Sequence, residues 1–515
     1  MVPSTDDSST LYVQGLRRLR AGDPRAAGAL LTHCLDVNPT HQGARRNLIR
    51  ALLVSAEYER VLAQTDIALE TAPNLAELHF ARGTALNGLG RPHEARDALT
   101  RATTLDPSHA AARLNLGNAC VDQDDLAAAE VQYRAALACD PHLAEAQASL
   151  GYLLTAQGRL PEAIAACETA IHLRPEFAQA HWNLAVASLL AGDLPRGFRE
   201  YEWRKRHDRF RRDFVDLPGP VWDGGDPAGR RILVHAEQGF GDTIQFARYL
   251  PLIAARGGMP ILACEGPLLR LLAGLPGVTV VAKDRKLPDY DCWIDQMSLP
   301  HAFGTALDTI PSAGGYLTPE PGLVSLWQEK LPPGRKIGLV WAGNSLHSND
   351  RRRSIPPAAL RPLLSLPDIA WINLQTGPAA DNPVMPALRL TDFADTAAVI
   401  ANLDFVVTVD TSVAHLAGAI ARPAWIMLPY APDWRWLLHR INSPWYATLR
   451  LFRQAAPGDW VSVVEDIARA LRGEAHRIQL SSSERPRARA QATRGHAAAC
   501  EADLRITRLP ASGDK

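Results

Sequence analysis

Proline recurs every 34 residues along the first third of the chain, at Pro39, Pro73, Pro107, Pro141 and Pro175. Three further series keep the same spacing: Gly83, Gly117 and Gly151; Ala95, Ala129 and Ala163; Ala102, Ala136 and Ala170. A fixed period of this length indicates stacked structural repeats, each covering the apolar side of its neighbour. The period therefore predicts an all-α solenoid for this part of the chain.

The residue types of the repeat fit pairs of antiparallel helices. Small residues allow two helices to cross closely, and a proline ends the second helix before the next unit begins. The units resemble the tetratricopeptide repeat. Five run over residues 8–177, the first two less regular because Ile49 and Val61 replace the glycine and the alanine. A sixth unit turns aromatic and basic, so we expect it to cap an array spanning residues 8–209.

Solenoids of this kind curve, and their concave face commonly receives an extended segment of another chain. We therefore expect a protein or peptide partner on the concave face. The alternative is an array that only supports the neighbouring domain or mediates dimerisation.

Bulk composition narrows the other classes. The 515 residues suffice for two or three domains, and 47% apolar with 21% charged residues is typical of a globular protein. The 55 basic and 55 acidic residues give no overall attraction to nucleic acid or anionic lipid. The seven cysteines show no Cys-x-x-Cys spacing, and no apolar run reaches the length of a membrane span. We expect a cytoplasmic protein with neither a nucleic-acid partner nor a membrane span.

After a Pro- and Gly-rich linker at 210–228, the pattern changes to short β-branched runs separated by helical stretches. The expected strands cover 231–237, 260–266, 278–283, 290–296, 336–343, 370–377, 404–412 and 423–430. This alternation predicts two successive Rossmann-like, doubly wound parallel sheets, in lobes at 229–330 and 331–475. Residues 476–515 have little periodicity and are expected to be disordered.

Ligands of such sheets bind at the carboxyl ends of the strands, so the loops there carry the candidate site. After the first strand, Gly239 and Gly241 would let the chain turn sharply and a ligand approach, with a helix starting at Asp242 or Thr243. Asp242 places a carboxylate at the crevice. Its simplest alternative role is a helix cap.

The loop after the first strand of the second sheet is rich in hydrogen-bond donors. Three consecutive arginines, Arg351 to Arg353, follow Asn344 and a short polar stretch containing His347, Ser348 and Asn349. Guanidinium groups suit phosphate oxygens, although a charge run is usually a solvated face. We predict a phosphate site.

A third loop ends the strand "DFVVTVD" in Asp410 and opens a helix at Thr411 and Ser412. The first-turn amides through Val413 and the two hydroxyls favour a negatively charged ligand, and Asp410 suits a sugar hydroxyl. His415 lies one turn on and is either part of the site or a core histidine. Gln375 and Thr376 end another strand and are expected near a nucleotide. Trp434 and Trp436 either stack on a ligand or, the reading we favour, pack at a domain seam.

These loops resemble those of bacterial heptosyltransferase-like glycosyltransferases (glycosyltransferase family 9), which have the GT-B architecture of two Rossmann-like sheets. The most specific segments are "EQGFGDTIQFARYLP", "WAGNSLHSNDRRRSIP" and "VTVDTSVAHLAGA". The combination with repeats is similar to that of the protein O-GlcNAc transferases.

The resemblance implies an inverting, metal-independent transfer of a sugar from a nucleotide-diphosphate-sugar donor to a hydroxyl of a protein or glycan, without a cofactor. Asp242 matches the proposed catalytic base, Arg353 the basic residue on the diphosphate, and Asp410-Thr411-Ser412 the donor-binding helix start. Arginine replaces the family's lysine and Ser412 its glycine, which changes the detail of the donor site.

Two other functions remain open at this point. The second half can be a catalytically inactive scaffold that only holds a nucleotide sugar, or an enzyme such as a nucleotide-sugar epimerase on the same sheets. The base, the sugar and the acceptor are not specified by the sequence.

Overall fold

The computed structural model describes residues 7–210, 214–311, 314–345, 349–377, 385 and 387–473. The chain forms two compact units. Unit 1 comprises Met1–Pro218 with the short segments Ser298–Thr309 and Asp433–Leu438, and unit 2 comprises Gly219–Met297, Ile310–Pro432 and His439–Lys515. The expected disordered tail at 476–515 lies outside the described residues.

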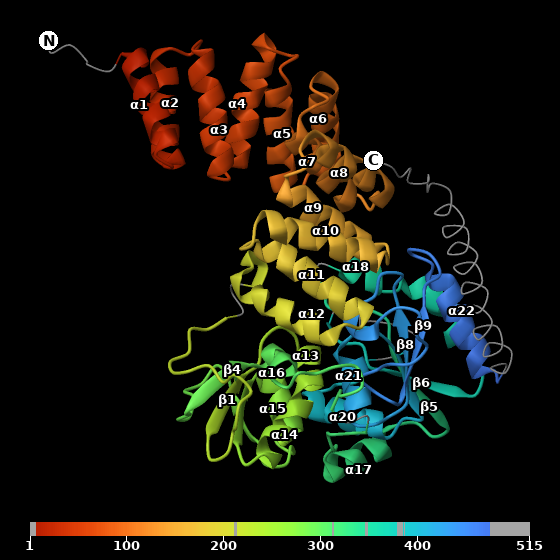
Figure 1. Ribbon diagram of the computed structural model, residues 1–515. Coiled ribbons are helices and arrows are strands. Elements are labelled where there is room, and N and C mark those ends of the chain that lie inside the picture. The colour runs from red at the N-terminus through yellow and green to blue at the C-terminus, as the bar shows by residue number, and fades with distance from the viewer. Residues whose placement is uncertain are drawn as a thin grey trace, which may run out of the picture. The chain divides into compact units, whose positions relative to one another are not determined.

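Unit 1 is built of antiparallel helix pairs (Figure 1). The first helices of the pairs are α1 (Ser8–Arg20), α3 (Gln42–Val54), α5 (Ala76–Gly88), α7 (Ala110–Asp122), α9 (Ala144–Ala156) and α11 (Ala178–Ala191). The second helices are α2 (Pro24–Val37), α4 (Tyr58–Thr71), α6 (Pro92–Leu105), α8 (Leu126–Cys139), α10 (Leu160–Leu173) and α12 (Leu194–Tyr201). The predicted helical solenoid is confirmed.

The recurring glycines lie where the two helices of a pair cross. A Cβ atom added to Gly83, Gly117 or Gly151 would come within 2.4 Å of a side chain on the second helix of the same pair. The recurring alanines are fully buried on that second helix. Small residues therefore set the close packing of these three pairs, as the period predicted.

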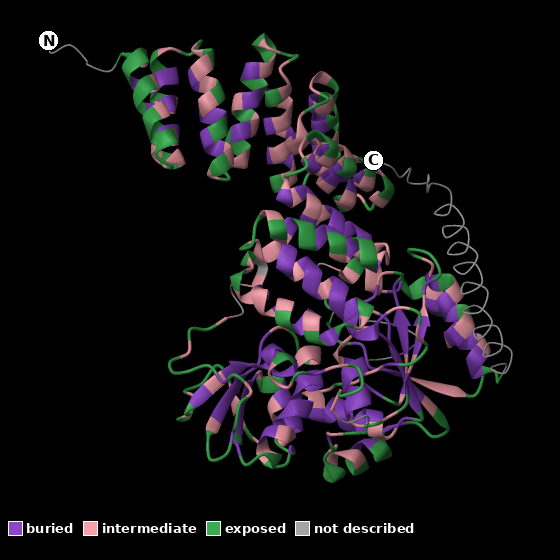
Figure 2. Cartoon of the chain, viewed as in Figure 1, coloured by how far each residue is buried: buried purple, intermediate pink, exposed green. Residues whose placement is uncertain are grey.

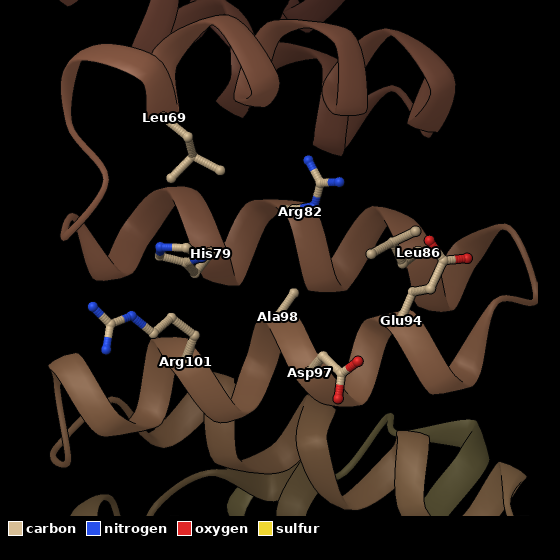
Figure 3. A pocket seen from close by; sticks show the side chains of 8 residues that line it. All are labelled: Leu69, His79, Arg82, Leu86, Glu94, Asp97, Ala98 and Arg101. Carbon is tan, nitrogen blue, oxygen red and sulfur yellow. The ribbon is translucent and has the colours of Figure 1, made fainter.

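One repeat departs from this packing. At one position of the 34-residue period, four repeats have a buried leucine: Leu48, Leu116, Leu150 and Leu184. The third repeat has Arg82 at this position, and its side chain is 31% exposed and forms an ion pair with Asp66. Beside it lies an open cavity of about 360 Å³ (Figure 3). It is lined by Leu69, His79, Arg82, Leu86, Glu94, Asp97, Ala98 and Arg101. The apolar core of the array divides there into two clusters, one ending at Ala85 and the other starting at Leu86.

We expect Arg82→Leu to stabilise the array. The leucine would extend the apolar core into the cavity for about 1–2 kcal/mol, while the lost ion pair is exposed and contributes less than about 1 kcal/mol. Thermal unfolding followed by helical circular dichroism should show a midpoint several degrees higher. The reciprocal Leu116→Arg should lower the midpoint. An unchanged midpoint in both variants would contradict the inference that a leucine at this position of the repeat stabilises the array.

The sixth unit carries aromatic and charged groups that pack with the two short segments of unit 1. Arg204 is fully buried and donates hydrogen bonds of 2.8 Å to Glu202 and to the Ser298 hydroxyl. Trp434 is buried with its ring centroid 5.5 Å from that of Phe198. Of the two interpretations of this tryptophan, packing is the one the structure supports.

Unit 2 contains two parallel sheets, so the predicted fold class is confirmed (Figure 1). The first has the order β3-β2-β1-β4 and consists of β1 (Arg231–His235), β2 (Met259–Cys264), β3 (Thr279–Ala282) and β4 (Cys292–Asp295). The second has the order β6-β5-β7-β8-β9. Its strands are β5 (Arg335–Val340), β6 (Ile369–Asn373), β7 (Phe405–Val409), β8 (Ala424–Leu428) and β9 (Leu449–Arg453).

Helices connect and cover these strands. They are α13 (Phe240–Phe246), α14 (Leu250–Ala255), α15 (Leu269–Leu272), α17 (Pro321–Lys330), α18 (Asp350–Arg353), α19 (Arg361–Leu364), α20 (Phe393–Ala401), α21 (Ser412–Ala419) and α22 (Trp460–Leu471), whereas α16 (Leu299–Ala302) belongs to unit 1. Strand β7 is buried at every residue, and Figure 2 shows the buried centre of the second sheet. Among the described residues, every helix is too short or too polar to cross a bilayer.

Candidate functional site

The loop after β1 turns at Gln238. This residue has the left-handed φ of +64°, whereas Gly239 is extended at −100°. The expectation that the glycines make the sharp turn is therefore wrong. Helix α13 starts at Phe240, earlier than the expected start at Asp242 or Thr243, so Asp242 lies in its first turn. The Asp242 carboxylate accepts a 2.9 Å hydrogen bond from the Gly239 N–H and so caps the start of the helix.

Gly241 brings the first-turn end of α13 against α21. A Cβ atom at this position would lie 2.9 Å from Cδ2 of His415 and 3.5 Å from the Cα of Ser412. A side chain cannot fit there without moving one helix. Gly241 thus allows two helices to pack closely. From the sequence we had expected it to let a ligand approach the backbone.

We expect Gly241→Val to destabilise unit 2 by about 2–3 kcal/mol, because overpacking a tight contact forces neighbouring groups apart. Gly266→Val is the matched control, since an added Cβ at Gly266 meets nothing within 4 Å. Chemical denaturation followed by tryptophan fluorescence measures both variants. Equal midpoints would show that the contact between α13 and α21 carries no such constraint.

The loop after β7 has the geometry of a helix start. Thr411 is the extended N-cap of α21, and its hydroxyl lies 3.1 Å from that of Thr408. The helix begins at Ser412, and its first N–H groups have no acceptor within the helix. Val413 and His415 are buried. Nδ1 of His415 shares a 3.1 Å hydrogen bond with the Tyr446 hydroxyl, so the histidine is packed in the core behind the helix start.

Arg353 links the loop after β5 to the end of β7. Its Nη1 donates a 3.1 Å hydrogen bond to the main-chain carbonyl of Asp410, and its Nε donates to Asp350 at 3.2 Å. The side chain is 16% exposed. The sequence analysis did not identify Asp350 and Gly343 as part of this site. A Cβ atom added at Gly343 would lie within 2.5 Å of the Asp350 and Arg353 side chains. The pairing of Asp350 with Arg353 could have been predicted, because an acidic residue three positions before an arginine lies on the same face of a helix.

The remaining predicted residues have separate positions. Gln375 is buried, and its amide oxygen accepts the N–H groups of Trp341 and Ala342 at 3.2 and 3.0 Å. Gln375 therefore holds the end of β5 in place. Thr376, the next residue, is exposed. Asn344, Arg351 and Gly239 are also exposed. His347 and Ser348 lie outside the described residues.

A buried cation connects α13 with the loop before β9, and the sequence analysis did not identify it. Arg248 is 3% exposed, and its guanidinium donates to the carbonyls of Gln245 at 2.8 Å and Trp445 at 2.9 Å. Burial opposes the charge, yet interaction with Tyr316 and Tyr446 holds the pKa of Arg248 above its usual value. Burial raises the pKa of Tyr446 well above its ordinary range. This cluster supports His415, and through it the contact with Gly241.

Direct contacts therefore connect three of the predicted loops. Arg353 reaches Asp410, and Gly241 reaches Ser412 and His415. We define the candidate site as Asp242, Arg353, Asp410, Thr411 and Ser412. It combines a carboxylate, a guanidinium and the start of a helix at the carboxyl ends of β1, β5 and β7.

Comparison with known proteins identifies the repeats. A tetratricopeptide-repeat model matches residues 80–144, and a TPR-repeat model matches residues 151–192. Protein FlbA of Caulobacter vibrioides is 30% identical over 320 residues, which are 55% of this chain and 53% of FlbA. The chain thus spans about half the length of this curated relative.

Solved structures resemble parts of the chain. A thermophilic TPR protein of Thermus thermophilus is 22% identical and covers 35% of this chain and 99% of its own, with a TM-score of 0.31. MamA from Desulfovibrio magneticus is 20% identical and covers 34% of this chain and 99% of its own, with a TM-score of 0.30. The matches to the two repeat models show that the chain carries tetratricopeptide repeats. An α/β region of two parallel sheets follows them.

Proposed function

We propose that unit 2 is a GT-B glycosyltransferase that moves a sugar from a nucleoside-diphosphate sugar to a hydroxyl group, and that the repeats bind the protein or peptide that presents or accompanies the acceptor. The observation that supports this most directly is the hydrogen bond from Arg353 to the carbonyl of Asp410. It places a guanidinium at the start of α21, 3.1 Å from the chain that opens the helix.

A guanidinium beside a helix start suits a diphosphate. The guanidinium offers planar, charge-assisted donors, and the first-turn amides add unpaired donors and the positive end of the helix dipole. Both would stabilise the charge on the departing nucleoside diphosphate. The hydroxyls of Thr411 and Ser412 add short polar groups for the donor sugar or its phosphates.

Asp242 is the group proposed to take the proton. Gly241, next to it in the chain, contacts Ser412 and His415, so the first turn of α13 borders the start of α21. One carboxylate oxygen accepts the Gly239 N–H. As general base the carboxylate would accept the acceptor hydroxyl's proton as that oxygen attacks the anomeric carbon from the side opposite the leaving group, which inverts the configuration.

The second candidate function is a scaffold that holds a nucleotide sugar without turning it over. One observation favours it: both charged groups already have structural partners, since Asp242 accepts the Gly239 N–H and Arg353 pairs with Asp350. A carboxylate and a guanidinium kept only for these contacts would leave binding without chemistry.

Thermal-shift measurements on the full chain with ADP-, UDP-, GDP- and CDP-sugars test the binding part. A donor present at about 100 times its Kd stabilises the folded state by about 2.7 kcal/mol, which raises the midpoint measurably. Release of the nucleoside diphosphate from the stabilising donor tests the chemistry. Binding with no release for any acceptor or for water would favour the scaffold, and no stabilisation by any donor would refute both functions.

A further inference from the structure

Two aromatic–histidine pairs recur in the repeat array, two repeats apart. The rings of Tyr12 and His41 lie 4.6 Å apart between centroids, and those of Phe80 and His109 lie 4.6 Å apart as well. Tyr12 and Phe80 are on the first helices α1 and α5. The histidines are the N-caps of α3 and α7.

The hydrogen bonds around each pair recur with the rings. Nδ1 of His41 accepts from the Ala44 N–H at 3.1 Å, and Nδ1 of His109 accepts from the Ala112 N–H at 3.3 Å. Arginines on the two following helices bond the same kinds of partner: Arg45 to Gln64 and the Pro39 carbonyl, Arg113 to Gln132 and the Pro107 carbonyl. The two sites therefore share one framework, and they differ in the ring paired with the histidine, Tyr12 or Phe80, and in their flanking residues.

The flanking residues differ in charge. In the first site, Arg46 and Arg50 lie one turn apart on α3, both exposed and without an acidic partner in the described part of the chain. The equivalent residues in the second site are Leu114, which is buried, and Asn118, which accepts the Tyr133 hydroxyl at 2.8 Å. The framework therefore does not require the two arginines.

The two arginines lie on the helix face that Tyr12 contacts. The Tyr12 hydroxyl is 3.4 Å from the Asn47 amide nitrogen and 3.2 Å from a Cβ added at Gly43. Residues 43, 46, 47 and 50 follow the three- and four-residue spacing of one helix face. Tyr12, His41, Arg46 and Arg50 thus form one surface, which we call the arginine–tyrosine patch. In Figure 1, α1 and α3 lie at the amino-terminal end of the array, with α2 drawn between them.

We propose that the arginine–tyrosine patch binds an acidic, extended segment of a partner protein, while the matching Phe80–His109 pair receives a neutral, apolar part of the same segment. This inference rests on the proposed partner-binding role of the repeats and specifies the partner's chemistry. Two guanidinium groups one turn apart offer planar forks for carboxylates, and the tyrosine and histidine rings offer an apolar floor.

Charge complementarity selects this occupant over the alternatives. An apolar segment would bury the two arginines without counter-charges, which is costly, and a basic segment would be repelled. Exposed arginines are often only solvated. Here they stand beside a ring pair whose second copy has buried leucine and hydrogen-bonded asparagine in their place.

The test measures binding of two dye-labelled dodecapeptides to the full chain by fluorescence anisotropy without any sugar donor. One peptide alternates Glu with Ala, and the other has Gln in place of every Glu. We expect the Glu peptide to bind at least 10-fold more tightly, with affinity falling as salt rises. Arg46→Glu combined with Arg50→Glu should remove that preference.

Arg25→Glu is the matched control, because Arg25 on α2 is also exposed, lies on a second helix and has no acidic partner in the described residues. Its binding should stay within twofold of the original chain. Circular dichroism confirms that each variant remains folded. Equal affinity for the two peptides, or an equal loss with Arg25→Glu, would overturn the proposal, and neither result bears on transfer by unit 2.

Discussion

Asp242→Asn is expected to lower sugar transfer by a factor of about 10²–10⁴ while leaving donor binding within about twofold, because a positioned general base contributes on this scale. Asparagine keeps an oxygen that can accept the Gly239 N–H, so this capping hydrogen bond and the helix start are preserved. What is lost is the capacity to take a proton. Initial rates with a saturating donor measure the first quantity, and calorimetric titration with the donor measures the second.

Asp459→Asn is the control for this substitution. Asp459 caps α22 in the same unit by accepting the Ser462 N–H at 3.1 Å, so its replacement tests the general effect of removing a capping carboxylate. It should leave transfer unchanged. Parallel loss of transfer and donor affinity in Asp242→Asn would show that Asp242 maintains the site's shape, which is the role expected of it in a scaffold.

The repeat architecture could be predicted because it is local. Each pair of helices is specified by residues within one period, such as Gly117 against Tyr133, and the period repeats the signal several times. The strands β1 to β8 were also predicted, since buried parallel strands are β-branched runs bounded by turns. Strand β9 was missed: Leu449–Arg453 alternates apolar residues with arginines, and it is the edge strand of the sheet, next to β8.

The details of the candidate site depend on contacts between distant segments, so the sequence predicted its residues better than their roles. Gly241 was noticed as a glycine, but its neighbour is His415, 174 positions later. Gln375 ends a strand as expected, yet its amide holds Trp341 and Ala342. Arg248 gave no signal because its partners are carbonyl groups and aromatic rings, which no spacing rule connects to an arginine.

Arg353→Met is expected to weaken donor binding by about 10- to 100-fold, because hydrogen bonds to charged groups are worth about 1.5–3 kcal/mol. Methionine keeps much of the side-chain volume but loses the hydrogen bond to the Asp410 carbonyl and the ion pair with Asp350. The loss should be larger for the nucleoside diphosphate than for the nucleoside monophosphate, since the guanidinium is proposed to contact the diphosphate. Calorimetric titration with both nucleotides measures this difference.

Arg353→Lys separates charge from geometry. Lysine keeps the positive charge but lacks the planar fork that reaches both the Asp410 carbonyl and a phosphate, so it should restore only part of the affinity. Arg361→Met is the matched control, because Arg361 is exposed at the start of α19 in the same unit. If Arg353→Met lowered the affinities for the two nucleotides equally, or no more than Arg361→Met does, the role of Arg353 would be only to connect α18 with the end of β7. The diphosphate would then have to be held by the start of α21 alone.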